Sequence, residues 1–454
     1  MEISALLLAR VQFALSLNFH VLFAALALAL GWVLGFFRWM AWRRPDAAWM
    51  AAYRFWVRIF ALAFILALAS ALPVLFELGT LWPALLERVG NVAGPLLAFG
   101  VTTLFLVKSV FMGVMLFGQR RVSDPAHVFA VFAVALGLTC TIFWGVVLQS
   151  WTHVPKGATL IDGRYQVIDW AELILNPAMG WYLALFAAGG VLTTGFLMLG
   201  ITAWQAGRRP LEDGERLTFR TGLGVALLGL AMQALALDGT ARMTAHYQPA
   251  TAAAVAGYRD SGSAPDLVWF GGSVTTRQGP SDAVQAQNPT TQKQVTATRW
   301  LGHDAQGTLI GLDAVDEEAL PPVETVFWLA RLALLTWFVM AAVLLVTSGV
   351  AAVRGADPGG QPRALLRMQF WSTFLGAVAW LTVWNLVEIG RTPFLVWGTL
   401  TQEDLLTEVG AQSLWVGLVA TAVLYAVLLT GFVGMLFHAA RYGVVPVRKP
   451  GARA

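Results

Sequence analysis

Long apolar runs separated by shorter polar connections dominate the chain from its beginning to its end. Each run is long enough to cross a bilayer as a helix, which needs about 20 mostly apolar residues. The pattern therefore predicts an all-α polytopic membrane bundle of about nine transmembrane helices. Their expected cores are residues 12–37, 54–76, 93–117, 127–149, 181–205, 219–238, 324–352, 367–390 and 411–437.

One connection differs from the others in length and composition. Residues 239–323 are rich in Gly, Thr, Gln and Asp and contain no spanning run. A connection of this length is usually functional or a linker. We therefore divide the chain into helices one to six over 1–238, the connection 239–323, and helices seven to nine with a tail over 324–454.

Positive charge is unevenly distributed between the two ends of the predicted bundle. The connections 38–53, 118–126, 206–218 and 353–366 and the tail from 438, with the adjoining helix ends, hold more than half of the 30 Lys and Arg residues. Loops rich in Lys and Arg stay in the cytoplasm. We therefore expect the amino terminus outside and the carboxyl terminus in the cytoplasm.

Composition agrees with a membrane protein and excludes several other classes. The chain is 57% hydrophobic and only 12% charged, whereas soluble domains are about 25% charged. Because the net charge of +4 has to be read loop by loop, it does not indicate nucleic acid, and we expect no such partner. The single cysteine, Cys140, allows no disulfide within the chain and no cysteine metal cluster.

One histidine lies well inside the first apolar run. His20 follows ten residues of RVQFALSLNF and precedes VLFAALALAL. A polar side chain at that depth is costly unless it is paired or bound, so His20 is a functional candidate. Imidazole is a common axial ligand of haem iron. The alternative is a hydrogen bond that joins two membrane helices.

The residues around His20 resemble a known family. The pattern R-x-Q-F-A-L-x-x-x-F-H-x-L-F is similar to the first helix of subunit I of cytochrome bd quinol oxidases. Further segments resemble that subunit: FELGTLW at 76–82, ELILNP at 172–177, FLMLGITAW at 196–204 and GRTPF at 390–394. The resemblance implies nine helices, a quinol-binding loop between helices six and seven, a bacterial cytoplasmic (inner) membrane, and an axial haem ligand at His20.

Other haem ligands of that family are missing at the matching positions. The resemblance places the histidine and methionine of the low-spin haem b at Leu185 and Ala333, which have no donor atoms. It places carboxylates of the family at Gly100, Lys108 and Leu381. We therefore expect the low-spin haem site to be lost and at most one haem to be held, through His20.

Several charged residues have two possible roles. Lys108 is expected inside the third helix, either in an ion pair with Glu388 or Glu77 or in contact with a haem propionate or a proton path. Arg331, Glu388 and Arg391 are expected to contact haem propionates or to anchor helix ends.

The quinol-binding motif is also altered. The segment HYQPATAAAVAG keeps Gln248 and Pro249, but Thr251 and Ala256 stand where the family has a lysine and a glutamate. This altered motif gives only weak support for quinol as a partner. Membrane lipid is an expected partner of the chain.

Three hypotheses of function follow. The preferred one is a haem-poor companion of a complete subunit I, or of subunit II, in a bd-type oxidase that reduces oxygen to water. The second is an oxidase subunit that itself holds one or two haems through His20 and unfamiliar ligands. The third is a membrane transporter or scaffold without redox chemistry.

Overall fold

The computed structural model describes residues 5–44, 46–262, 300–402, 405 and 410–442. Within these residues, nine helical segments are long and apolar enough to cross a membrane. The prediction of a multi-pass all-α bundle is thus confirmed. The spanning helices are α1 (Ala5–Arg43), α2 (Ala47–Leu81), α3 (Pro83–Leu106) with α4 (Gly113–Phe117), α5 (Asp124–His153), α7 (Met179–Ala206), α8 (Asp213–Tyr247), α11 (Val323–Arg354), α12 (Arg363–Trp371) with α13 (Leu375–Gly390), and α14 (Ala411–Tyr442).

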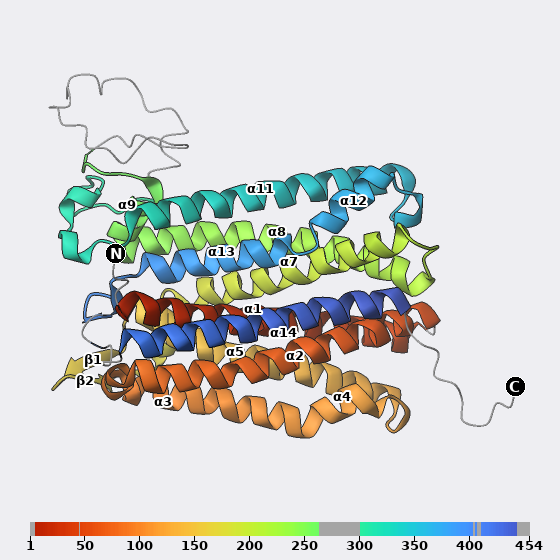
Figure 1. Ribbon diagram of the computed structural model, residues 1–454, viewed down its shortest axis with the longest axis horizontal. Coiled ribbons are helices and arrows are strands. Elements are labelled where there is room, and N and C mark those ends of the chain that lie inside the picture. Colours follow the sequence, from red (N-terminus) through yellow and green to blue (C-terminus); the bar gives the residue numbers. More distant parts are fainter. Residues whose placement is uncertain (1–4, 45, 263–299, 403–404, 406–409, 443–454) are drawn as a thin grey trace, which may run out of the picture.

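The long helices lie side by side and run roughly parallel to one axis (Figure 1). In the most apolar part of α7, 83% of the residues are buried inside the protein, and in α1 72%, whereas the value for α14 is 11%. Helices α1 and α7 therefore form the centre of the bundle, and α14 presents most of its surface to the outside of the bundle.

Short elements cover one end of the bundle. The hairpin of β1 (Ala158–Ile161) and β2 (Arg164–Val167) lies there with the eight-residue helix α9 (Pro249–Ala256) (Figure 1). Tyr165 of β2 packs against Trp151 and shares a 2.5 Å hydrogen bond with Thr399. Burial raises the pKa of Tyr165, so its hydroxyl stays protonated.

The other end carries arginine-based contacts between helices. Arg38 of α1 is 1% exposed, donates to Nδ1 of His127 at 3.0 Å, and forms an ion pair with Asp124. Both partners belong to the first turn of α5. These contacts fix the end of α1 against the beginning of α5.

Helix ends and breaks differ from the expected cores. Helix α8 continues to Tyr247, nine residues beyond the expected end at 238, because Gly239 packs against the ring of Trp181 and Met243 is buried. The eighth span is interrupted at 372–374. There the hydroxyls of Ser372 and Thr373 donate to carbonyls three residues back, which competes with the regular helical pattern.

Candidate haem site

The ring of His20 is held by helix α2. Its Nδ1 lies 3.0 Å from the carbonyl oxygen of Ala67 and 3.2 Å from Oγ of Ser70. A carbonyl oxygen only accepts, so Nδ1 carries the proton and donates, and Nε2 keeps its lone pair. A ring fixed through Nδ1 in this way is the usual arrangement of histidines that bind metals through Nε2.

A buried carboxylate bridges the same two helices nearer the beginning of α1. Glu77 of α2 is 4% exposed, and its Oε1 accepts from Ser16 at 2.9 Å and from Gln12 at 3.2 Å. Glu77 therefore lies inside the protein, between α1 and α2. Helix α1 thus meets α2 through two polar contacts, one at His20 and one at Glu77.

Helix α1 is also aligned with α13 close to His20. The side-chain amides of Asn18 and Asn385 donate to each other at 3.1 and 2.9 Å. A reciprocal amide pair fixes both the spacing and the register of two helices. Because Asn18 is two residues before His20, this pair also fixes where His20 lies along α13.

A second polar cluster lies at that end of α13, around Glu388. Its Oε2 accepts from Arg391 at 2.8 Å and its Oε1 from Gln149 of α5 at 2.8 Å. Oε1 also lies 3.8 Å from Nε2 of His153, the last residue of α5. Arg391 in turn donates to Thr152 and to the carbonyl of Leu395. Glu388 and Arg391 therefore tie α13 to α5.

His153 is completely buried and connects this cluster to the start of α9. The amide nitrogen of Gln248 lies 3.1 Å from both Nδ1 and the carbonyl oxygen of His153. The hydroxyl of Thr251 donates to the carbonyl oxygen of Gly390 at 2.6 Å. The altered quinol motif is therefore part of a helix whose polar side chains already bind α5 and α13.

Sequence reasoning missed His153 and Gln149, because the expected core of this helix ended at residue 149, whereas α5 continues to His153. The available signal was their spacing of four residues, which places both on one face of a helix if the helix reaches that far.

Arg331 holds the other end of α9. Its guanidinium donates to the carbonyl oxygens of Val255 and Ala256, and it lies 3.5 Å from the ring centroid of Phe327. A cation at the carboxyl end of a helix satisfies carbonyls that have no partner within that helix. The guanidinium thus serves as a helix cap.

The expected ion pair of Lys108 with Glu388 or Glu77 does not form. Lys108 is exposed, and no hydrogen bond or ion pair joins it to another residue of the described part of the chain. Both carboxylates bind partners on other helices, Glu77 to Ser16 of α1 and Glu388 to Gln149 of α5. Lys108 belongs to a π-helical turn, Val107–Met112, which shifts the face on which its side chain emerges.

Aromatic side chains fill the region around Leu185 and Ala333. Both residues are buried in one apolar cluster with Phe186, Trp380 and Trp384. The ring centroids of the two tryptophans are 5.6 Å apart, and that of Phe186 lies 5.1 Å from Trp380. At positions 185 and 333 themselves, Leu and Ala offer no donor atom to a metal.

Close helix contacts surround the same cluster. A Cβ atom built on Gly189 would lie 2.3 Å from the ring of Trp380, and one on Gly190 would lie 2.3 Å from the carbonyl oxygen of Ala25. Only glycine permits α7 to approach α13 and α1 this closely. This glycine pair therefore serves helix packing.

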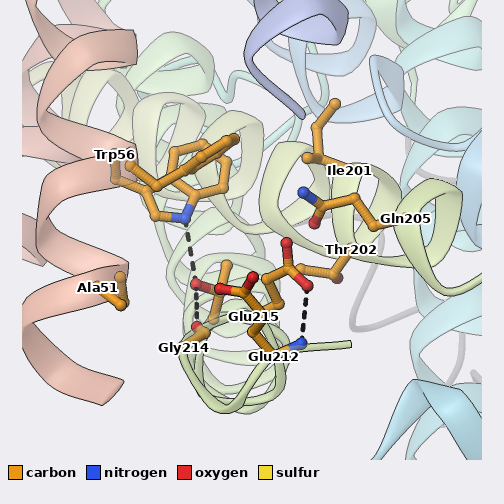
Figure 2. A pocket seen from close by; sticks show the side chains of 11 residues that line it. Ala51, Trp56, Ile201, Thr202, Gln205, Glu212, Gly214 and Glu215 are labelled. Atoms are coloured by element: carbon orange, nitrogen blue, oxygen red, sulfur yellow. Dashed lines mark hydrogen bonds between the residues drawn. The ribbon is translucent and has the colours of Figure 1, made fainter. Parts of the chain in front are cut away.

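A small cavity lies where α2, α7 and the start of α8 meet (Figure 2). Glu212 and Glu215 beside it form a capping box at the start of α8. Glu215 also binds Arg209 and raises the pKa of that guanidinium. Trp56 donates to Thr218 at 3.3 Å across the cavity wall. These side chains already bind one another, so we assign this cavity to helix packing.

Comparison with known proteins identifies the family. The family model "Cytochrome bd terminal oxidase subunit I" matches residues 8–444. The chain is 25% identical to "Cytochrome bd ubiquinol oxidase subunit 1" of Bacillus subtilis, over 94% of this chain and 91% of that protein. It is 24% identical to "Cytochrome bd-II ubiquinol oxidase subunit 1" of Escherichia coli, over 96% of each.

The fold agrees with this result. A chain in "The structure of bd oxidase from Geobacillus thermodenitrificans" matches with a TM-score of 0.83 and 20% sequence identity, over 96% of this chain and 98% of that one. The sequence pattern around His20 had indicated the same family. The chain therefore belongs to the cytochrome bd terminal oxidase subunit I family and is a subunit of a terminal oxidase.

Proposed function

We propose that this chain is a haem-poor companion subunit in a bd-type complex that reduces oxygen to water. Its partner would be a complete subunit I or a subunit II. The observation that carries the proposal is the region around Leu185 and Ala333. At these two positions the side chains have no donor atoms, and Phe186 and Trp380 fill the surrounding space. We derive no step through a haem at that place.

His20, in contrast, has the chemistry of an axial ligand. Its ring is fixed through Nδ1 by Ala67, and Nε2 keeps the lone pair that would bind haem iron. A haem there supplies an iron that changes its oxidation state. The contribution of this chain is the ligand nitrogen, the hydrogen bond that orients it, and the Asn18–Asn385 pair that positions α1.

The charged residues near the ends of α13 and α9 have structural roles in this proposal. Arg391 and Glu388 bind each other and α5, and Arg331 binds the carbonyls of α9. We therefore assign them to helix anchoring, not to propionates. The proposal also excludes quinol oxidation at α9, because Gln248 and Thr251 already bind His153 and Gly390.

We further propose that α1 begins outside a bacterial inner membrane and α14 ends in the cytoplasm. Residues rich in Lys and Arg flank the end of the bundle that holds Arg38, Arg54 and Arg120. Such residues favour the cytoplasmic side.

A second candidate function has one specific observation in its favour. Glu388 lies seven residues after Leu381, which is two helical turns and so the same face of α13. A carboxylate is therefore present on the face of α13 where the resemblance implies one, two turns away from the matching position Leu381. In this candidate function the chain itself holds a second haem through Glu388.

Counting haems separates these functions. The native complex is purified, its subunits are separated by mass, and haem is quantified for each chain. The companion proposal predicts no more than one haem per copy of this chain and a copurifying oxidase subunit. Two haems on this chain purified alone would instead establish the second candidate. No haem together with no oxidase partner would contradict both and leave a transporter or scaffold.

A further inference from the structure

A cavity rich in arginine opens at one end of the bundle, between α2 on one side and α4 with the short segment that follows it on the other. Arg54, Arg58 and Val57 line it from α2, and Leu116, Gln119 and Arg120 line it from the opposite side. Its lining residues include no carboxylate. Three positive charges therefore converge on one concave site without an acidic partner in its wall.

Of the three arginines that line the cavity, Arg54 is held by a hydrogen bond to the protein, whereas Arg58 and Arg120 can bind a ligand. Nε of Arg54 donates to Oε1 of Gln119 at 3.1 Å, which joins α2 to the opposite wall. The side chains of Arg58 and Arg120 are exposed, and neither makes a hydrogen bond or ion pair with any residue in the described ranges. Their guanidinium donors are thus free to bind a ligand.

The depth of Arg58 in the helix indicates a membrane ligand. Arg58 lies 11 residues after the start of α2 at Ala47, which is about 17 Å along the helix at 1.5 Å per residue. An arginine in an apolar span is costly unless it pairs with an anion. Phosphate oxygens accept two parallel hydrogen bonds from a guanidinium, which suits this site.

An exposed apolar stripe runs away from the cavity along α2. Ile65 and Leu72 follow Arg58 at intervals of seven residues, so all three share one helix face, and the two apolar side chains are 58% and 69% exposed. Phe117, beside the cavity on α4, is 74% exposed. A positively charged pocket next to an exposed apolar stripe is complementary to a lipid, because the pocket suits an anionic head group and the stripe suits an acyl chain.

We propose that this cavity binds the phosphate of an anionic phospholipid, with Arg58 and Arg120 as its main donors and the α2 stripe as the seat of an acyl chain. A free phosphate ion offers the same oxygens, but it leaves the stripe unused. The inference does not depend on the haem content of the chain.

Native mass spectrometry of the purified complex tests this site. The complex in detergent is titrated with phosphatidylglycerol or with phosphatidylcholine. The double variant Arg58→Gln/Arg120→Gln is compared with Arg44→Gln/Arg363→Gln, which removes the same charge from exposed arginines at the same end of the bundle, outside the cavity. We expect the cavity variant to bind phosphatidylglycerol about 30-fold more weakly, from about fivefold for each arginine, and the control to bind it like the wild type.

Two further arms sharpen the result. Arg58→Lys/Arg120→Lys keeps the charge, and we expect it to bind phosphatidylglycerol within a few-fold of the wild type, which excludes a general folding defect. Equal binding of the two lipids, or equal binding by the cavity and control variants, would overturn the proposal. The proposal would also be overturned if inorganic phosphate bound at the site without displacing lipid, because the ligand would then be a soluble anion.

Discussion

His20 and Leu185 lie on two neighbouring central helices, α1 and α7, but their surroundings are opposite in kind. His20 has a polar donor atom, a fixed ring and a partner on α2. Leu185 lies in an apolar cluster of aromatic rings, next to glycines that let helices touch. One region holds a side chain that could bind a metal, and the other holds apolar packing.

Under the proposed function, this difference teaches that the loss of a cofactor site is more than the loss of its ligands. A porphyrin fills a large volume, and without it a bundle must either collapse or fill the space with side chains, because membrane proteins gain stability from close packing. Trp380 and Trp384 provide that volume here.

The largest effect is expected for Trp380→Ala. Trp380 is 1% exposed and contacts Phe186, Trp384 and Gly189. Its removal leaves a cavity that should cost about 3 kcal/mol, the lower end of the range for buried tryptophan, because transfer into lipid offsets part of the loss. Thermal or denaturant unfolding in detergent measures the change. The control is Trp371→Ala, which removes an indole that is 81% exposed; equal destabilisation of both variants would refute the packing role.

A smaller effect is expected for Gly190→Ala. The new methyl group would meet the backbone of Ala25, which cannot move aside as a side chain can. Overpacking of this kind costs about 2 kcal/mol. The matched control on the same helix is Gly180→Ala, whose Cβ would have no atom within 4 Å. If the stability of Gly190→Ala were no lower than that of the control, α7 and α1 would not be in close contact.

A still smaller effect is expected where α1 meets α13. Replacing Asn18 by Ala removes two hydrogen bonds to Asn385, and interhelical polar contacts of this kind are worth about 1 kcal/mol together. A double-mutant cycle with Asn385→Ala isolates the coupling between the two amides. A coupling energy near zero would mean that this pair does not position α1.

The sequence predicted the spanning helices and the family well, and the contacts between helices poorly. Nine apolar runs and the pattern around His20 are local signals that a single chain displays directly. The continuation of α8 to Tyr247 and the break after Trp371 depend instead on what packs against those residues. A hydropathy pattern carries no information about such partners.

The contacts of the polar cluster at the end of α13 could not be predicted from the sequence for the same reason. Glu388 was identified as a candidate, but its partners Gln149 and His153 come from a helix more than 200 residues earlier in the chain. The ion pair of Lys108 was one of two expected roles, and helical spacing alone says which face a residue occupies only while the helix stays regular. The π turn at Val107–Met112 breaks that assumption.

The central claim is that His20 is the one haem ligand kept by this chain, and His20→Ala tests it most directly. Haem is counted per chain in the purified complex, with His438→Ala as the control, since His438 is an exposed histidine at the far end of α14. Melting temperatures verify that both variants fold. We predict that His20→Ala loses the haem assigned to this chain while His438→Ala keeps it. A folded His20→Ala complex that retained its full haem content would contradict the account and reduce His20 to a contact between α1 and α2.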